Sequence, residues 1–290
     1  MRDYMTINSD CIFAKPQLEF ALPTAGCKPI VRWAGSKKKL IKQLLAFVPK
    51  SFERYIEPFA GSACLFFALH PPKAVLNDIN PELIQFYVSI KKHPILTCRE
   101  VITYPQTKDF YLYVRSLPTN ELNPIEQAAR FFFLNRMCFN GLYRTNKKGQ
   151  FNVPMGSKTG TFPSHREFIQ VARALENVCL LNQDFEEALS DIRQGDFIYL
   201  DPPYFSNYER RRNEYGNNCF TTEDLPRLIK ILEKIDNIGA TFLLSYTNNA
   251  MLLNHLRSYK IHPIVVRRSI SGFASHRKNV EEVIITNRVN

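Results

Sequence analysis

The sequence predicts an α/β fold: a doubly wound, Rossmann-like sheet with an inserted, mostly helical unit. Helical and strand-like patterns alternate over residues 29–92 and again over residues 176–290, which is the rhythm of parallel α/β sheets. Between these two stretches the strand rhythm disappears and helical patterns prevail. A chain of 290 residues can also bury a full core without disulfides or a structural metal.

The first half of the predicted sheet follows an N-terminal extension. Residues 1–28 have no convincing periodicity, and we assign them no role. The predicted elements that follow are a basic helix over residues 37–47, a strand over 54–57, a helix after Gly61, a strand over 74–77 and a helix over 81–91. This order is the opening of a doubly wound sheet.

The predicted inserted unit spans residues 93–175. It contains a helical stretch around Tyr111, an apolar helix over residues 125–139 and a basic, Gly-punctuated loop over 141–160. The sheet then resumes with strands over 178–182, 197–200, 241–245, 264–268 and 282–285, and with helices over 225–234 and 250–256. We therefore divide the chain into an extension (1–28), a sheet domain (29–92 and 176–290) and an inserted domain (93–175).

Charge and composition limit the classes of partner and cofactor. A formal charge of +11 and a pI near 9.3 attract polyanions such as nucleic acid, although a solvated basic surface has the same composition. The seven cysteines form no CxxC pair and the six histidines include no ligand spacing, so we expect reduced thiols and no metal. No apolar stretch reaches the length of a membrane span and no signal peptide is evident. We expect a cytoplasmic protein that has no membrane partner.

The turn after the strand over residues 54–57 is a candidate site for an adenosine-bearing ligand. Its residues include Glu57, Pro58, Phe59, Gly61 and Ser62. A tight turn into a helix lets the backbone approach a ligand closely. Asp78 ends the next strand, where an acid accepts hydrogen bonds from ribose hydroxyls in nucleotide-binding folds; capping of the next helix is an alternative role. Because the turn is not GxGxxG, the spacing argues against a dinucleotide.

A second candidate site follows the apolar strand over residues 197–200. It consists of Asp201, Pro202, Pro203 and Tyr204, at a carboxyl end of the sheet. The Asp201 carboxylate and the Pro202 carbonyl can each accept an N–H of an exocyclic amine, which localises its lone pair for attack on a methyl group. The prolines stiffen the backbone, and Tyr204 can stack on a base removed from a duplex. A rigid loop with a capping aspartate is the structural alternative.

Together these segments resemble the Dam-like, α-group family of adenine-N6-specific DNA methyltransferases, over nearly all of residues 29–287. The resemblance implies a Rossmann-like methyltransferase sheet, S-adenosylmethionine as the methyl donor, and residues 93–175 as a target-recognition domain. It implies that the cofactor is bound by Trp33, Ala34, Gly35, Lys37, Glu57, Pro58, Phe59, Gly61, Ser62, Asp78, Asp184, Phe185 and Asp201, with Lys37 near the cofactor's carboxylate. Ser36 and Ala63 stand where the family usually has Gly.

Residues 139–154 resemble the family's target-recognition hairpin, and residues 267–271, 277–278 and 282–287 resemble its C-terminal motifs. The resemblance implies DNA contacts by Arg144, Asn146, Lys147, Lys148 and Lys158. Arg and Asn side chains can pair bidentately with guanine and adenine edges, and lysines can bind phosphates; a solvated basic hairpin is the alternative. Residues 207–216 either close over a flipped adenine or form a functionless loop.

The expected function is methyl transfer from S-adenosylmethionine to N6 of a flipped-out adenine in double-stranded DNA, at a short palindrome of the GATC type. The enzyme acts alone or beside a cognate restriction endonuclease. Methylation of adenine in RNA or of N4 of cytosine is one alternative. A non-catalytic DNA-binding protein that has kept the fold is another, and it would bind duplex without transferring a methyl group.

Overall fold

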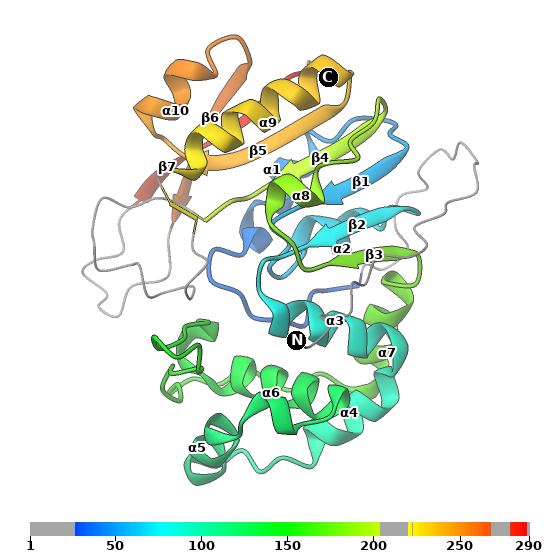
Figure 1. Cartoon of the computed structure of the whole chain (residues 1–290), viewed down its shortest axis with the longest axis vertical. Helices are drawn as coiled ribbons and strands as arrows, with labels where there is room; N and C mark the ends of the chain where they lie inside the picture. Colours follow the sequence, from blue (N-terminus) through cyan, green and yellow to red (C-terminus); the bar gives the residue numbers. More distant parts are fainter. Residues whose placement is uncertain (1–26, 204–219, 222, 268–278, 289–290) are drawn as a thin grey trace, which may run out of the picture.

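A seven-stranded sheet lies at the centre of the computed structural model, which describes residues 27–203, 220–221, 223–267 and 279–288 (Figure 1). Its strands are β1 (Arg54–Glu57), β2 (Ala74–Asn77), β3 (Val178–Leu181), β4 (Asp196–Leu200), β5 (Thr241–Thr247), β6 (Lys260–Arg267) and β7 (Asn279–Thr286). They lie in the order β3-β2-β1-β4-β5-β7-β6. The first five pair in parallel, whereas β7 is antiparallel to both β5 and β6. Because the order reverses between β1 and β4, that junction is the switch point of a Rossmann-like sheet.

Both faces of the sheet are buried. Tyr55 and Phe197 belong to the hydrophobic core on one face. Their neighbours Ile56 and Ile198 belong to the core on the other face. Burial on both faces explains why adjacent residues of these parallel strands, such as Tyr55 and Ile56, are apolar rather than alternating between apolar and polar.

Helices cover each face. One face carries the 3-10 helix η1 (Lys37–Leu40), α1 (Ile41–Leu45), α2 (Cys64–Leu69) and α3 (Pro81–Lys92). The other face carries α8 (Phe185–Ala188), α9 (Asp224–Ile238) and α10 (Ala250–His255). The result is a three-layered α/β/α arrangement, as the predicted fold class requires.

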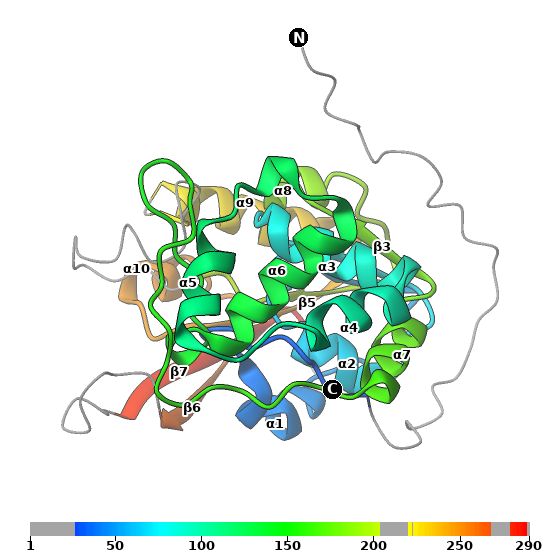
Figure 2. The ribbon, with the colours of Figure 1, turned by 90° about the horizontal axis from the view of Figure 1, so that it is seen from below.

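The inserted segment is mostly helical. It contains α4 (Pro94–Ile102), α5 (Lys108–Ser116), η2 (Thr119–Glu121), α6 (Pro124–Met137), η3 (Phe139–Gly141) and α7 (His165–Ala174). The helices gather beside α3 (Figures 1 and 2), and Phe132 of α6 stacks on Phe86 of α3 with ring centroids 4.9 Å apart. A smaller core holds α5, the end of α6 and the segment that follows it. Since α6 and α7 also share the main core, the boundaries of the inserted domain stay a prediction.

The observed elements differ from the predicted ones mainly at their ends. β6 begins at Lys260 rather than at residue 264 and includes Pro263. A proline fits there because β6 is an edge strand. α9 continues past the predicted end at residue 234 to Ile238, where Gly239 terminates it at φ +80°. α4, α7 and α8 lie where no separate element was predicted.

Within the described ranges, no helix is both long enough and apolar enough to cross a membrane. In the same residues, no group of histidine, cysteine, aspartate or glutamate side chains could hold a metal ion. The cysteines described by the structure, which are Cys27, Cys64, Cys98, Cys138 and Cys179, carry free thiols.

Candidate active site

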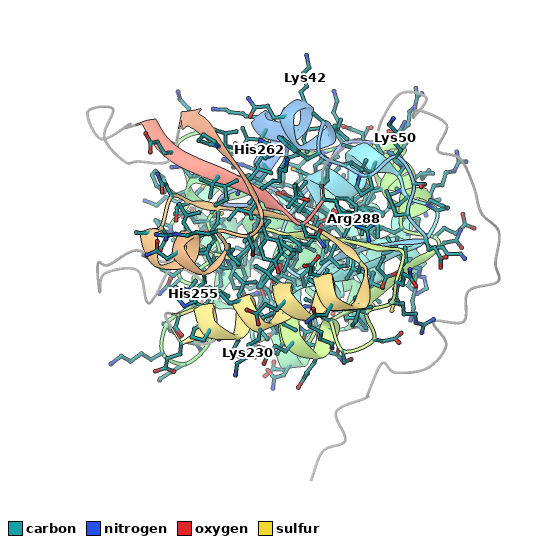
Figure 3. All side chains as sticks on the ribbon, turned by 90° about the horizontal axis from the view of Figure 1, so that it is seen from above. Lys42, Lys50, Lys230, His255, His262 and Arg288 are labelled. Atoms are coloured by element: carbon teal, nitrogen blue, oxygen red, sulfur yellow. The ribbon has the colours of Figure 1, made fainter. Side chains whose placement is uncertain are left out.

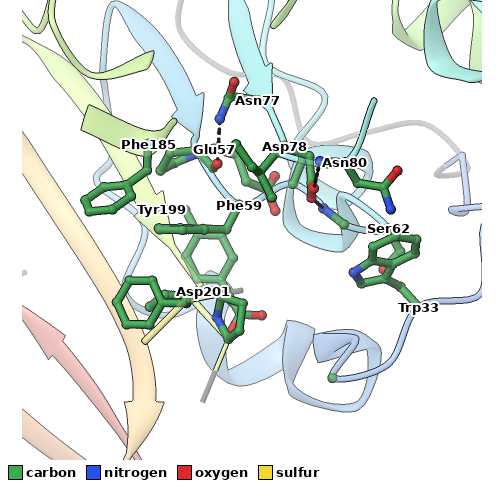
Figure 4. Close-up of a pocket in the computed structure, with 18 of the residues that line it drawn as sticks. Trp33, Glu57, Phe59, Ser62, Asn77, Asp78, Asn80, Phe185, Tyr199 and Asp201 are labelled. Atoms are coloured by element: carbon green, nitrogen blue, oxygen red, sulfur yellow. Dashed lines mark hydrogen bonds between the residues drawn. The ribbon is translucent and has the colours of Figure 1, made fainter. Parts of the chain in front are cut away.

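A cavity of about 450 Å³ opens at the switch point of the sheet (Figure 4). It is bordered by the turn after β1, the residues that follow β2 and β3, and the residues that follow β4. Open α/β sheets bind ligands at this place, and the volume lies in the range of roughly 300–1,000 Å³ typical of small-molecule sites. The fold therefore joins segments that are far apart in the sequence into one candidate site.

All the residues of the predicted cofactor set line this cavity. They are Trp33, Ala34, Gly35, Lys37, Glu57, Pro58, Phe59, Gly61, Ser62, Asp78, Asp184, Phe185 and Asp201. Pro202 and Pro203 line it as well. Tyr204 and the predicted loop 207–216 lie outside the described residues, as do residues 268–271 and 277–278 of the predicted C-terminal motifs.

The turn after β1 brings the backbone of Gly61 against the indole of Trp33. Gly61 has φ +48°, and a Cβ at this position would lie 2.6 Å from Cδ1 of Trp33. Ala63 is also left-handed, with φ +50°, and is fully buried. This turn therefore keeps its tight geometry where the family commonly has a second Gly, at a conformational cost of about 1–2 kcal/mol.

Asp78 ties the glycine turn to the end of β2. Its Oδ2 accepts a hydrogen bond from the Gly61 amide and its Oδ1 accepts one from the Asn80 amide, each at 2.9 Å. Burial raises the pKa of Asp78 to about 6, although these two bonds act in the opposite direction. The cap of α3 is Asn80, whose side chain accepts from the Leu83 amide at 3.1 Å. Asp78 is therefore not the capping residue of that helix.

Asp201 is paired with Lys37. The Lys37 ammonium donates to Oδ1 of Asp201 at 2.6 Å and to the Gly35 carbonyl at 3.2 Å. The two side chains are only 7% and 18% exposed. Burial raises the pKa of Asp201, and the Lys37 charge opposes that rise. None of the described residues donates a hydrogen bond to the second oxygen, Oδ2.

Glu57 is a buried acid at the end of β1. It is 2% exposed, and its Oε2 accepts a hydrogen bond from the Tyr55 hydroxyl at 2.8 Å. Burial raises the pKa of Glu57 well above its usual range, and the charges of Asp201 and Asp78 raise it further. These shifts favour the neutral acid, which limits the negative charge gathered at the switch point.

The segment after β3 is held by Arg227 of α9. Asp184 Oδ1 accepts from Nη2 of Arg227 at 2.5 Å. The same guanidinium donates to Glu186 at 2.7 Å and to Asp224 at 2.6 Å, and it lies over the Phe185 ring at 4.7 Å from the centroid. One arginine thus contacts both Asp184 and Phe185 of the predicted cofactor set.

Several lining residues were not predicted from the sequence. Phe220 and Asp224 belong to no motif; Phe220 packs edge-to-face on Phe59 with centroids 6.0 Å apart. Tyr143 was predicted only as part of the hairpin, and the fold brings it to the cavity. The others adjoin predicted residues or lie on the same elements, and they are Ser36, Ala60, Cys64, Leu65, Asn77, Ile79, Asn80, Gln183 and Tyr199.

The predicted recognition segment forms a hairpin closed by a turn at Asn146. The Asn146 carbonyl accepts from the Gly149 amide at 2.9 Å, and Gly149 has φ +75°. The side chain of Asn146 is engaged within the same turn. Its Oδ1 accepts from the amides of Lys148 and Gln150, and its Nδ2 donates to the Gln150 side chain. Asn146 therefore holds the shape of the turn.

The remaining residues predicted to contact DNA lie on or after this hairpin. Nε of Arg144 donates to the side chain of Asn152 on the opposite strand at 2.7 Å, and the Asn152 amide donates to the Arg144 carbonyl at 3.0 Å. Lys147, Lys148 and Lys158 are exposed. The hairpin thus presents basic side chains to solvent on a backbone fixed by hydrogen bonds across its strands.

Sequence comparison identifies relatives along nearly the whole chain. Residues 33–270 match the model of the D12 class N6 adenine-specific DNA methyltransferase family. The chain belongs to this family. It is 34% identical over 271 residues to the Type II methyltransferase M1.LlaDCHI of Lactococcus lactis subsp. cremoris, covering 90% of this chain and 95% of that one. It is 32% identical over 285 residues to the Type II methyltransferase M.MjaIII of Methanocaldococcus jannaschii (90% and 99%), and 28% identical over 263 residues to the DNA adenine methylase of Escherichia coli K12 (89% and 94%).

Membership of the D12 family makes the chain an adenine-specific DNA methyltransferase. The predicted family and enzyme class are confirmed, and so is the predicted Rossmann-like sheet. The substrate of this D12 enzyme is DNA.

Proposed function

We propose that this D12-family enzyme transfers the methyl group of S-adenosylmethionine to N6 of an adenine flipped out of double-stranded DNA. One observation carries the proposal: the Gly61 turn, the Asp78 carboxylate and the Asp201 carboxylate border a single cavity of about 450 Å³. This juxtaposition supports a site for an adenosine-bearing ligand next to a group that can accept N–H bonds from an amine.

The residues around the cavity fit S-adenosylmethionine. Gly61 offers backbone without a Cβ, and Asp78 is a buried carboxylate that can accept hydrogen bonds from ribose hydroxyls. Asp184 and Phe185 would bind the adenine, while Trp33 would line the other side. When bound, S-adenosylmethionine would supply the methyl group, as the N6–C bond forms, the S–C bond breaks with its electron pair left on sulfur, and the amine releases a proton.

Asp201 and Pro202 prepare the amine for this attack. Oδ2 of Asp201 and the Pro202 carbonyl would each accept one N–H of N6, which directs the lone pair toward the methyl group. Lys37 holds Oδ1 at 2.6 Å and so fixes the carboxylate before the substrate arrives. Because burial raises the pKa of Asp201, the carboxylate is also suited to accept the released proton. Tyr204 would stack on the flipped adenine.

Recognition of the DNA site is assigned to the hairpin. We assign guanine contact to Arg144, and phosphate contact to Lys147, Lys148 and Lys158. Asn146 acts by holding the turn, because its amide group is occupied there. The proposed target is a short palindrome of the GATC type.

The proposal also includes the biological setting. Residues 29–92 and 176–290 would form the catalytic domain, residues 93–175 the target-recognition domain, and residues 1–28 an extension. The enzyme would act in the cytoplasm. Two of its relatives carry Type II methyltransferase names, which supports a functional partnership with a cognate restriction endonuclease as one alternative and a solitary methylase as the other.

The test uses purified protein, tritiated S-adenosylmethionine and unmethylated genomic DNA, followed by nucleoside analysis and sequencing of the methylated sites. Label is expected in N6-methyladenine at one short palindrome. Asp201→Ala should abolish it, whereas the matched control Asp109→Ala, an exposed residue at the start of α5, should not. Label in RNA or in N4-methylcytosine, or tight DNA binding with no label, would overturn the proposal.

A further inference from the structure

Tyr143 belongs to two sites at once. It lies in the hairpin beside Arg144, and its side chain also lines the cavity at the switch point of the sheet. No other described residue of segment 139–154 lines that cavity. Tyr143 is therefore the point at which the hairpin and the cavity share a wall.

On the cavity side, Tyr143 contacts the glycine turn through Trp33. The indole of Trp33 lies against the bare Cα of Gly61, where a Cβ would be 2.6 Å from Cδ1. The rings of Trp33 and Tyr143 are stacked, with centroids 6.0 Å apart and an interplanar angle of 24°. A displacement of the indole toward the hairpin therefore presses on the tyrosine ring, because close-packed interiors transmit strain.

On the DNA side, Tyr143 packs against both α6 and the returning strand of the hairpin. Its ring lies 6.1 Å from that of Phe131 and 5.6 Å from that of Phe151, measured between centroids. Phe151 pairs with Thr145 across the hairpin. Tyr143 thus sets the distance between the hairpin and the body of the enzyme, and it immediately precedes the arginine assigned to base contact.

A charged pair lies near the outer end of the ring. The Glu82 carboxylate of α3 lies near the Tyr143 hydroxyl and raises its pKa, although burial is the larger cause. Glu82 is itself paired with Arg130 of α6 at 3.3 Å. The hydroxyl end of Tyr143 therefore lies near the Glu82–Arg130 pair of α3 and α6, and its ring face lies against the indole of Trp33.

We propose that Tyr143 is a positioning residue that couples cofactor binding to DNA binding. The inference rests on the proposed function, since it assumes that S-adenosylmethionine fills the cavity and that the hairpin contacts DNA. A ligand in the cavity fixes Trp33, and Trp33 fixes Tyr143 and the hairpin strand that carries Arg144. By linkage, DNA bound to the hairpin tightens cofactor binding by the same factor.

The experiment measures this factor. The dissociation constant of a short duplex carrying the mapped methylation site is determined with and without saturating S-adenosylhomocysteine, which cannot donate a methyl group. The ratio of the two constants is the coupling factor, and wild-type enzyme should give roughly fivefold or more, the lower end of ordinary allosteric coupling. Tyr143→Leu should reduce the factor to about one, because it removes the ring that joins Trp33 to the hairpin.

Two further variants separate coupling from damage to the fold. Tyr143→Phe keeps the stacked ring and should keep the factor. Tyr113→Leu changes a tyrosine of α5 that is 56% exposed, and it should leave the factor unchanged. If Tyr143→Leu weakens DNA binding equally with and without S-adenosylhomocysteine, its role is purely structural and the inference is wrong.

The outcomes also distinguish this inference from the proposed function. Wild-type enzyme that binds S-adenosylhomocysteine and methylates DNA, but shows a coupling factor of one, overturns the inference alone. Wild-type enzyme that binds no S-adenosylhomocysteine overturns both. Loss of coupling in Tyr143→Phe as well would assign the effect to the hydroxyl contact with Glu82 and overturn the route through the stacked rings.

Discussion

Removal of the Lys37 charge should shift the pH dependence of methylation in a defined direction. In the proposed mechanism, Asp201 has to be ionised to pair with Lys37 through Oδ1 and to accept an N–H bond from the amine through Oδ2, so activity is lost as the pH falls through its pKa. Burial raises this pKa, and Lys37, 2.6 Å away, lowers it. Lys37→Met removes the lowering effect, so the pKa rises and the acid limb of the profile moves to higher pH.

The size of the shift follows from the geometry. Two opposite charges about 4 Å apart interact by roughly 4 kcal/mol at an effective dielectric constant of about 20. That value is an upper limit, because the Asp201 side chain is 18% exposed and the surrounding water screens the charges. A neighbouring opposite charge usually lowers a carboxyl pKa by about 1–3 units. We therefore expect the acid limb of Lys37→Met to lie about 1–3 pH units above that of wild type.

The assay is kcat/KM for DNA as a function of pH at saturating cofactor, which reports groups of the enzyme before DNA binds. Lys42→Met is the matched control, because Lys42 lies on α1 and projects from the outer surface of the molecule (Figure 3). Its profile should coincide with that of wild type. An acid limb of Lys37→Met that is unchanged, or that moves to lower pH, would refute the electrostatic role assigned to the Lys37–Asp201 pair.

Three further predictions concern cofactor binding. Gly61→Ala should raise KM for S-adenosylmethionine tenfold or more, since the new methyl group displaces Trp33. The control Gly239→Ala also places a side chain at a positive φ, but with only ordinary contacts, so it should lower thermal stability without changing that KM. Arg227→Met should raise the same KM severalfold with kcat unchanged, because it releases the carboxylate beside the proposed adenine pocket, and steady-state kinetics checks both values. Cofactor affinity should fall as the pH drops below about 6, where Asp78 becomes protonated, and calorimetric titration of Asp78→Asn should show weak binding without this pH dependence.

Local sequence signals predicted most of the sheet. The strands over residues 54–57 and 74–77 have the predicted bounds, because each is a short apolar run that ends in polar residues at a turn. β6 was placed too late because Pro263 interrupts its pattern. Only the tertiary position of β6 at the edge of the sheet makes that proline acceptable. Edge positions depend on strand order, which no local pattern contains.

The candidate site also contains some residues that local sequence signals predicted and others that only the packing of the fold brings there. Gly61, Asp78 and Asp201 were predictable because each ends or follows a strand, and parallel strands bring their carboxyl ends together. Phe220 was not predictable, because it reaches the cavity by packing against Phe185. Arg227 was not predictable either, because it acts from α9 by lying over the Phe185 ring and does not line the cavity itself. Asn146 shows what residue type alone cannot predict, which is whether a side chain is engaged within its own turn. Its residue type fits adenine recognition, whereas the structure engages the amide in a turn that the sequence left open.

Charge is distributed differently over the outside of the molecule and over the cavity. The chain carries a formal charge of +11, which attracts the phosphate backbone of DNA. The cavity is lined instead by Glu57, Asp78, Asp184, Asp201 and Asp224, and among the described lining residues Lys37 is the only lysine or arginine. Burial favours the neutral form of Glu57. The ionised carboxylates of the cavity repel phosphates and accept hydrogen bonds from N–H and O–H groups, so they favour a neutral base, ribose hydroxyls and a cationic sulfonium. The missing GxGxxG spacing in the sequence and the acidic lining in the structure both support the proposed ligand, which carries adenosine but no diphosphate.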